Sequence, residues 1–322
     1  MNDLTPLALA RRLGSVYGQH FGAEPLTYPQ GVAISGRLRL AAIEGWSSAT
    51  AAEIAALVEP VVADPTRLPD NGPCLATACF ADELFAVTGD PRHREFLLAA
   101  ADRYLDRVGF DPDVRVEDFF FAGTLLGRAY RLTQSPVYAD RLMNYLVAAD
   151  TLQANGLYWH CCGSPWFWGR GNAFAALGLA EALSYVPDHP KRPALVARNA
   201  AHLVALAGYQ HSSGLWHQIV DDPATYLEHS ATTIIGYAIA RGLREGWLDG
   251  ADWPGILASA WDGAAARTGS AGELDQVCSS TGPLDSRHAY VERPFSTGID
   301  ERGGAMALWF AAEMARNTVG AR

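Results

Sequence analysis

Residues 156–172 bring three tryptophans and a tyrosine together with His160 and with Arg170, which lies between two glycines. Aromatic rings such as those of Trp166 and Trp168 offer flat apolar faces to the C–H groups of a sugar. An arginine guanidinium can hold a carboxylate through two parallel N–H bonds. The segment therefore predicts a site for a sugar that carries a carboxylate. The alternative is a tryptophan-rich part of the core in which Arg170 binds a backbone carbonyl.

An acid pair, Glu117 and Asp118, precedes three phenylalanines at residues 119–121 and is predicted to open an apolar helix. A carboxyl at this place can cap the helix. In a dry aromatic environment its pKa would instead rise, which suits a proton donor at neutral pH. Because neighbouring helical residues point about 100° apart, we expect only one of the two to face a site. Composition alone leaves the cap and the catalyst as equal alternatives.

Residues 214–230 form a third polar group, with two histidines and three acids. No pair has the His-x-x-x-His or Glu-x-x-His spacing of dedicated metal sites, so we predict no metal ion. Hydrogen bonding to sugar hydroxyls is the favoured role for His217. Asp221 and Asp222 equally fit a structural role in pinning the loop.

Helices are the elements predicted to position these groups, because apolar residues recur at helical spacing, as at Leu177, Ala180 and Leu183. Polar turns followed by a proline suited to a first helical turn recur at Pro91, Pro136 and Pro190. The repeat of about 50 residues is too long for common two-helix solenoid units. Over 322 residues it gives about six helical hairpins.

Six hairpins can close into an all-α (α/α)6 barrel with an inner and an outer ring, and an open solenoid is the alternative. The barrel is favoured because residues 173–183 are almost entirely apolar, as an inner helix requires. No linker composition interrupts the chain, so we predict a single domain over residues 1–322.

Alternate connections lie on opposite rims of such a barrel. The long ones, which hold the polar and aromatic groups, should meet at one mouth: residues 111–121, 156–172, 214–229 and 275–304.

The bulk composition excludes several classes of partner. A net charge of −10 without a basic patch argues against nucleic acid. Five cysteines, an odd number at low density, argue against a disulfide framework. No signal-like start and no run of about 18–20 apolar residues is present, so we expect a cytoplasmic protein that does not span a membrane.

Three stretches together resemble the unsaturated uronyl hydrolases of glycoside hydrolase families 88 and 105. They are residues 168–174 (Trp-Gly-Arg-Gly-Asn-Ala-Phe), residues 214–218 (Gly-Leu-Trp-His-Gln), and residues 292–294 with 303–305 (Glu-Arg-Pro and Gly-Gly-Ala). The resemblance extends from about Pro73 to Glu313. It implies an (α/α)6 barrel without metal or cofactor. It also implies an oligosaccharide substrate that ends in a 4,5-unsaturated uronic acid left by a polysaccharide lyase.

The reaction implied by this resemblance is hydration of the vinyl ether rather than displacement at the anomeric carbon. One carboxylic acid protonates C4 and, once ionised, takes a proton from the water that attacks C5. A gap-free match places this group on Glu117, whereas residue type favours Asp118, which we prefer. A second family aspartate has Asp70 as a loose candidate, next to Asn71.

The resemblance also implies substrate contacts for Trp168, Arg170 and His160. Phe174 stands where the family often has tryptophan, which would alter a stacking contact. Two other classes of function remain as alternatives. The first is another (α/α)6 carbohydrate enzyme, either an epimerase or an ordinary glycosidase. The second is a non-catalytic sugar-binding protein that keeps the aromatic and arginine groups.

Overall fold

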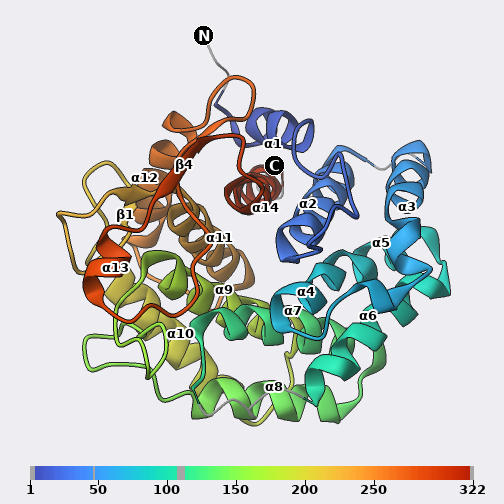
Figure 1. Ribbon diagram of the computed structural model, residues 1–322, viewed down its shortest axis with the longest axis horizontal. Helices are drawn as coiled ribbons and strands as arrows, with labels where there is room; N and C mark the ends of the chain where they lie inside the picture. Colours follow the sequence, from blue (N-terminus) through green and yellow to red (C-terminus); the bar gives the residue numbers. More distant parts are fainter. Residues whose placement is uncertain (1–3, 46–47, 107–112, 320–322) are drawn as a thin grey trace.

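The computed structural model describes residues 4–45, 48–106 and 113–319. Within them, long helices form two concentric rings (Figure 1). The inner ring closes on itself, because each helix packs against the next and α14 packs against α2. In ring order the inner helices are α2 (Tyr28–Glu44), α5 (Ala81–Thr88) with its preceding 3-10 turn η2 (Ala76–Phe80), α7 (Val116–Thr133), α9 (Gly169–Tyr185), α11 (His229–Glu245) and α14 (Glu301–Val319).

The outer ring alternates with the inner one along the chain. Its helices are α1 (Pro6–Gly14), α3 (Ser48–Val62), α6 (Pro91–Leu105), α8 (Pro136–Ala148), α10 (Arg192–Ala207) and α12 (Trp253–Ala266). Three short elements, η1 (Pro65–Arg67), α4 (Gly72–Leu75) and α13 (Arg287–Val291), lie in the connections. This arrangement confirms the predicted all-helical barrel in the described part of the chain.

Helix α9 shows why the inner ring is apolar on all sides. Every residue of α9 except Ser184 is buried, since the helix packs between α7, α11 and the outer helices. Gly178 lets α7 and α9 approach closely: a Cβ there would lie 2.2 Å from the backbone carbon of Phe119. Any side chain at Gly178 would therefore push the two helices apart.

The short turns lie where the proline repeat predicts them. Helix α5 ends at a left-handed Gly89, and α6 begins with Pro91. Helix α7 ends at a left-handed Gln134, and α8 begins with Pro136. After α9, the next helix begins two residues beyond Pro190, at Arg192.

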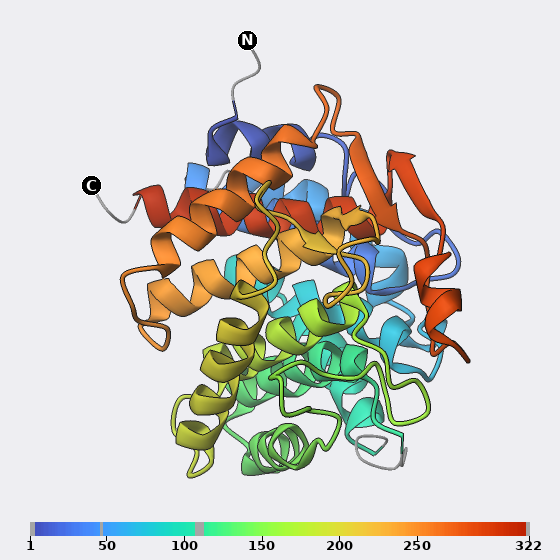
Figure 2. The same cartoon turned by 90° about the vertical axis from the view of Figure 1, so that its left-hand side faces the viewer.

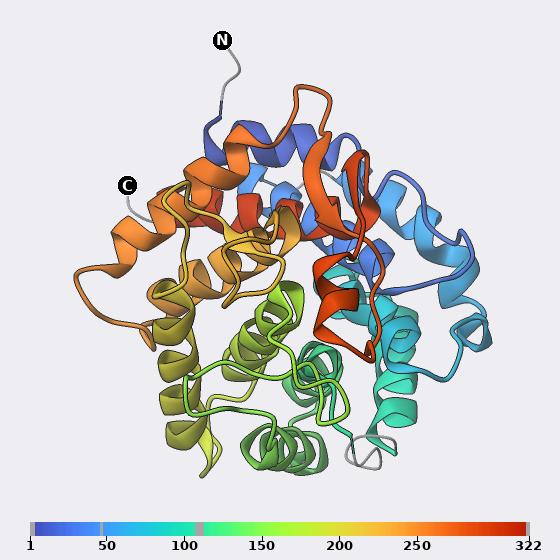
Figure 3. The same ribbon diagram turned by 60° about the vertical axis from the view of Figure 1, so that its left-hand side comes forward.

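The long connections lie on the opposite rim, at the right of Figure 2 and facing the viewer in Figure 3. They contain two small antiparallel sheets that helical periodicity did not predict. Strand β1 (Trp216–His217) pairs with β2 (Leu227–Glu228), and β3 (Leu274–Cys278) pairs with β4 (Phe295–Gly298). Residues 111 and 112 of the first predicted long loop lie outside the described residues.

All five cysteines are free, in agreement with the prediction that no disulfide framework exists. Among the described helices, none combines the length and the apolar character needed to cross a bilayer.

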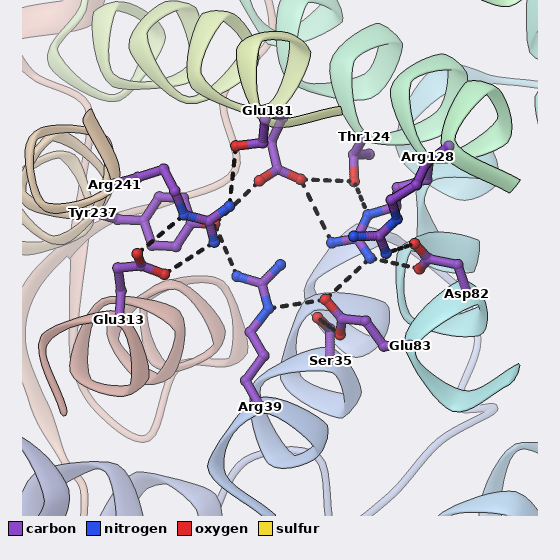
Figure 4. Close-up of polar contacts among 12 residues, drawn as sticks. Ser35, Arg39, Asp82, Glu83, Thr124, Arg128, Glu181, Tyr237, Arg241 and Glu313 are labelled. Atoms are coloured by element: carbon purple, nitrogen blue, oxygen red, sulfur yellow. Dashed lines mark hydrogen bonds and ion pairs between the residues drawn. The ribbon is translucent and has the colours of Figure 1, made fainter. Parts of the chain in front are cut away.

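Charged side chains from every inner helix meet inside the barrel (Figure 4). We call this cluster the charge ring; its members are Arg39, Asp82, Glu83, Arg128, Glu181, Arg241 and Glu313. Around the barrel the helices contribute alternately basic and acidic groups, so each charge lies between opposite charges.

Arg128 is the best-buried cation of the charge ring, with no exposed side-chain surface. Its guanidinium lies 2.6 Å from an Asp82 oxygen, 3.1 Å from Glu83 and 3.5 Å from Glu181. On the other side of Glu181, the Tyr237 hydroxyl donates to the carboxylate at 3.1 Å. The ring therefore compensates its buried charges internally and leaves the opposite rim to the long loops.

Candidate active site

A cavity of about 1250 Å³ opens at the rim that carries the long connections. Its walls come from the N-terminal ends of α2, α4, α7, α9 and α14. Exposed backbone N–H groups and a positive dipole end characterise such helix starts, and they favour anionic ligands. The cavity is lined on one side by Glu117 and Asp118 and on another by Trp168, Arg170 and Phe174.

Glu117 and Asp118 lie in the first turn of α7, as the sequence predicts. Negative side chains are stabilised there by the helix dipole. The Glu117 carboxylate does not cap the backbone of α7; its Oε1 lies 3.0 Å from His160 Nε2. The second oxygen, Oε2, is buried and has no hydrogen-bond partner among the described residues. A buried carboxyl oxygen without a partner is rare in proteins and is an atom available to a ligand.

Asp118 faces a different neighbour. The Tyr104 hydroxyl lies 3.4 Å from Asp118 Oδ1, and burial followed by the negative charge of Asp118 raises the pKa of Tyr104. Gly72 allows α4 to come close, since a Cβ at that position would lie 3.2 Å from Asp118 Oδ1 and 2.8 Å from the Phe121 ring. Both acids line the cavity, in different surroundings, so the expectation that only one of them faces the site is wrong.

His160 is fully buried and is not among the residues that line the cavity. Its carbonyl accepts a hydrogen bond from the Val116 N–H at 3.0 Å, which fixes the loop beside the start of α7. The imidazole ring lies next to Trp168, with a centroid distance of 4.8 Å. In this structure His160 therefore reaches the cavity through Glu117, and a direct contact with substrate stays a prediction.

Arg170 lies at the start of α9, buried between Trp168 and the end of β3. Its two terminal nitrogens donate to the carbonyls of Cys278 (2.5 Å) and Ser279 (2.8 Å). Arg170 Nε is buried and has no partner in the described part of the chain. The side chain thus has the carbonyl-binding role that was the structural alternative for it. Arg170 is also one of the residues that line the cavity.

The remaining predicted residues divide into two groups. Trp168 and Phe174 line the cavity, whereas Trp166, His217 and Asp70 are not among its lining residues. His217 is buried beside the Thr225 carbonyl, and Trp166 is half-buried against the core.

Asp70 forms an exposed ion pair with Arg103 at 2.6 Å. Its neighbour Asn71 lines the cavity instead and accepts a hydrogen bond from the Cys74 N–H at the start of α4.

Sequence reasoning missed several lining residues, among them Tyr28, Tyr104, Asp300 and Arg302. Arg302 donates to Asp300 at 2.9 Å, and its Nε is buried without a partner among the described residues. Both belong to the long connection at residues 275–304 and to the helix start that follows it. The polar character of that connection was visible in the sequence, but the individual side chains were not singled out.

Tyr28 joins the cavity from the far end of the chain. Its ring contacts those of Phe120, Phe121 and Phe174, with centroid distances between 5.7 and 5.8 Å. Tyr28, Phe121 and Phe174 thus give the cavity a connected aromatic lining. Among the described residues, no group of three or more His, Cys, Asp or Glu side chains is placed to hold a metal ion.

Comparison with known proteins identifies the family of this protein. Residues 116–318 match the Glycosyl Hydrolase Family 88 model, which covers more than half of the chain and includes both acids of α7. The unsaturated rhamnogalacturonyl hydrolase YesR of Bacillus subtilis is 29% identical over 235 residues, which are 70% of this chain and 66% of that protein. The chain thus spans slightly less than two thirds of that relative's length.

Solved structures share the fold over nearly the whole chain. A possible member of family GH105 from Salmonella enterica serovar Paratyphi A superposes with a TM-score of 0.83 at 20% identity, covering 97% of this chain and 94% of that one. The unsaturated glucuronyl hydrolase of Bacillus sp. GL1 gives a TM-score of 0.72 at 15% identity, covering 98% and 95%. Because the family match includes α7, α9, α11 and α14 and the barrel is shared throughout, the chain belongs to glycoside hydrolase family 88.

Proposed function

We propose that this chain hydrolyses oligosaccharides that end in a 4,5-unsaturated uronic acid by adding water across the C4=C5 double bond. The observation that carries the proposal is the Glu117 carboxyl at the cavity wall, with one oxygen bonded to His160 and the other without a partner. Family membership supports it, as do the names of the Bacillus relatives, an unsaturated rhamnogalacturonyl and an unsaturated glucuronyl hydrolase.

In the proposed mechanism, the protonated carboxyl of Glu117 gives its proton to C4 of the sugar. The positive charge that develops at C5 is shared with the ring oxygen. The Glu117 carboxylate then takes a proton from a water molecule whose oxygen bonds to C5. The ring oxygen takes the hydroxyl proton of the resulting hemiketal as the bond between C5 and the ring oxygen breaks. The product has a ketone at C5 and a hemiacetal at C1, and opening of the hemiacetal releases the attached sugar.

The choice of Glu117 over Asp118 rests on their surroundings. A group that is first acid and then base needs one oxygen held in place and one oxygen that no protein group occupies, which is the arrangement of Glu117. Asp118 lies between Tyr104 and Gly72, where its charge can help to orient water or a sugar hydroxyl. The preference for Asp118 from residue type stays untested, and paired variants of the two residues decide between them.

The uronate carboxylate needs positive partners in the same cavity. Arg170 and Arg302 line it, and the Nε of each is a buried donor with no partner among the described residues. Trp168 and Phe174 supply aromatic faces for the ring. Typical pockets for small ligands have volumes of about 300–1000 Å³, so a cavity of about 1250 Å³ leaves room for the sugar attached to the uronate.

The test is an activity assay on disaccharides made by lyases from rhamnogalacturonan and from a glucuronate-containing polysaccharide. Hydration destroys the conjugated double bond, so the ultraviolet absorbance of the unsaturated uronate should fall as free sugar appears. An epimerase or an ordinary glycosidase would leave this absorbance constant. Binding without any change in absorbance would instead support a non-catalytic sugar-binding protein.

A further inference from the structure

A buried hydrogen-bonded chain connects Glu117 to a tyrosine from the opposite end of the sequence. His160 Nε2 lies 3.0 Å from Glu117 Oε1, and His160 Nδ1 lies 2.5 Å from the hydroxyl oxygen of Tyr290. His160 and Tyr290 are both fully buried. The three residues come from α7, from the loop before α9 and from α13, so only the closed barrel places them in line.

The Tyr290 hydroxyl determines which nitrogen of His160 carries the imidazole proton. Burial raises the pKa of Tyr290 to about 12, so its proton is retained at neutral pH. The oxygen already accepts the Leu284 N–H at 3.2 Å. The Ser164 side chain also lies at the Tyr290 hydroxyl, but its own proton goes to the Leu284 carbonyl at 2.8 Å. We assign the tyrosine proton to His160 Nδ1, whose contact with the hydroxyl oxygen is 2.5 Å. The imidazole then carries its own proton on Nε2, which donates to Glu117 Oε1.

This tautomer has a consequence for the carboxyl. An Nε2–H group can donate to Oε1 both when Glu117 is a carboxylate and when it is a carboxylic acid protonated on Oε2. Oε1 is therefore occupied in both states, and the proton that moves is confined to Oε2, the oxygen without a partner. The opposite tautomer would place the acid proton on Oε1, directed at the imidazole, where it could not reach C4 of a substrate.

We infer that Tyr290 is a positioning residue, which fixes the Nε2–H tautomer of His160 and so keeps Glu117 Oε2 as the proton-transferring atom. The inference rests on the proposed function and adds to it a residue that does not touch substrate. Tyr290 is itself held in place, because its carbonyl accepts a hydrogen bond from the Gln218 side chain at 3.3 Å. The segment that carries Tyr290 also contributes cavity-lining Thr281.

Tyr290→Phe removes one hydroxyl and leaves the ring that packs beside His160. We expect kcat to fall at least about 10-fold, the scale on which loss of a group that orients another catalytic or ligating residue acts. KM should change less than about twofold, since the substrate contacts are untouched. The matched control is Tyr138→Phe, which also loses a buried tyrosine's hydrogen bond, from its hydroxyl to Asp102 at 2.5 Å, but between outer helices α8 and α6. The control should keep wild-type kcat.

A second measurement does not depend on turnover. In ¹⁵N-labelled protein, the two imidazole nitrogens report which one carries the proton, and the His160 signals are identified by their loss in His160→Gln. We expect the Nε2–H tautomer in the wild type and in Tyr138→Phe, and a mixture of tautomers in Tyr290→Phe. This measurement is made on the folded wild-type protein first, so it holds even if Tyr290→Phe proves unstable.

Either of two results would overturn the inference. One is an Nδ1–H tautomer in the wild type; the other is a Tyr290→Phe variant whose kcat and His160 signals match those of Tyr138→Phe. If the wild type hydrates no unsaturated uronate at all, the proposed function fails, but the tautomer measurement still decides whether Tyr290 controls His160. The failure of one proposal is thus separable from the failure of the other.

Discussion

Replacing Arg128 by methionine should destabilise the barrel far more than the same replacement at an exposed arginine. Arg128 has no exposed side-chain surface and serves three carboxylates of the charge ring. After its loss, Asp82 keeps Arg131 and Glu83 keeps Arg39. Among the described residues, Glu181 keeps only hydrogen bonds from hydroxyl groups, so a fully buried carboxylate loses its cation.

Removing one partner of a buried ion pair typically lowers the free energy of unfolding by roughly 3–5 kcal/mol. For a chain of this size each kcal/mol corresponds to about 2 °C in Tm, so we expect a decrease of about 6–10 °C. Adding Glu181→Gln to Arg128→Met removes the unpaired charge and should restore part of the loss. The two single variants and the double variant form a mutant cycle, measured by urea unfolding followed by circular dichroism.

The matched control is Arg92→Met. Arg92 also binds two carboxylates, Asp90 at 2.6 Å and Glu59 at 2.7 Å, but all three side chains are substantially exposed. Solvent screens such pairs, so the variant should unfold close to the wild type. Equal losses in Arg128→Met and Arg92→Met would refute the argument from burial. A double variant no more stable than Arg128→Met would refute the role assigned to Glu181.

Three further predictions concern the site and the stability of the fold in acid. Glu117→Gln should lower kcat by at least roughly 10²–10⁴-fold, the contribution typical of a general acid–base group, and Asp118→Asn should lower kcat less. If steady-state kinetics show the reverse order, Asp118 is the acid and base. Arg170→Lys keeps the charge but loses the Nε donor and the two bonds to the Cys278 and Ser279 carbonyls that hold the side chain in place. We therefore expect kcat/KM to fall about 10- to 100-fold, the scale of one or two charged hydrogen bonds, and a near-wild-type value would exclude Arg170 as the carboxylate partner. Although burial favours the neutral acid, Arg241 lowers the pKa of Glu313 to about 2. The lowered pKa contributes stability that is fully present above the unfolded-state pKa of about 4.3 and is lost as the pH falls towards 2. Glu313→Gln should therefore flatten the acid limb of a Tm-against-pH profile, and an unchanged limb would contradict this.

The two ends of the barrel interior hold charges in different ways. In the charge ring each carboxylate has an arginine or a hydroxyl partner, both for Asp82 and Glu83 in the first turn of α5 and for Glu181 and Glu313 in the C-terminal halves of α9 and α14. At the cavity the acids lie in the first turn of α7, where an oxygen of Glu117 stays without a partner. A buried polar atom without a partner is destabilising, and a substrate that binds it can recover that free energy.

Local patterns in the sequence determined the helices and their order. Apolar residues at helical spacing identified α9 as an inner helix, since a helix buried on all sides must be apolar on all sides. Pro91 and Pro136 predicted where outer helices begin, because proline fits a first helical turn. The acid pair was correctly expected to open α7. Each of these signals acts over a few neighbouring residues and can therefore be read from a linear sequence.

The tertiary structure alone decided which side chains meet. Nothing in the spacing of residues indicates that Tyr290 reaches His160, 130 positions away, or that Asn71 rather than Asp70 lines the cavity. The charge ring was equally hidden, because an isolated Glu or Arg in a helix is usually a solvated surface residue. Burial and pairing of such groups depend on helices that are distant in sequence and meet only when the barrel closes, so this information exists in the packing and not in any single segment.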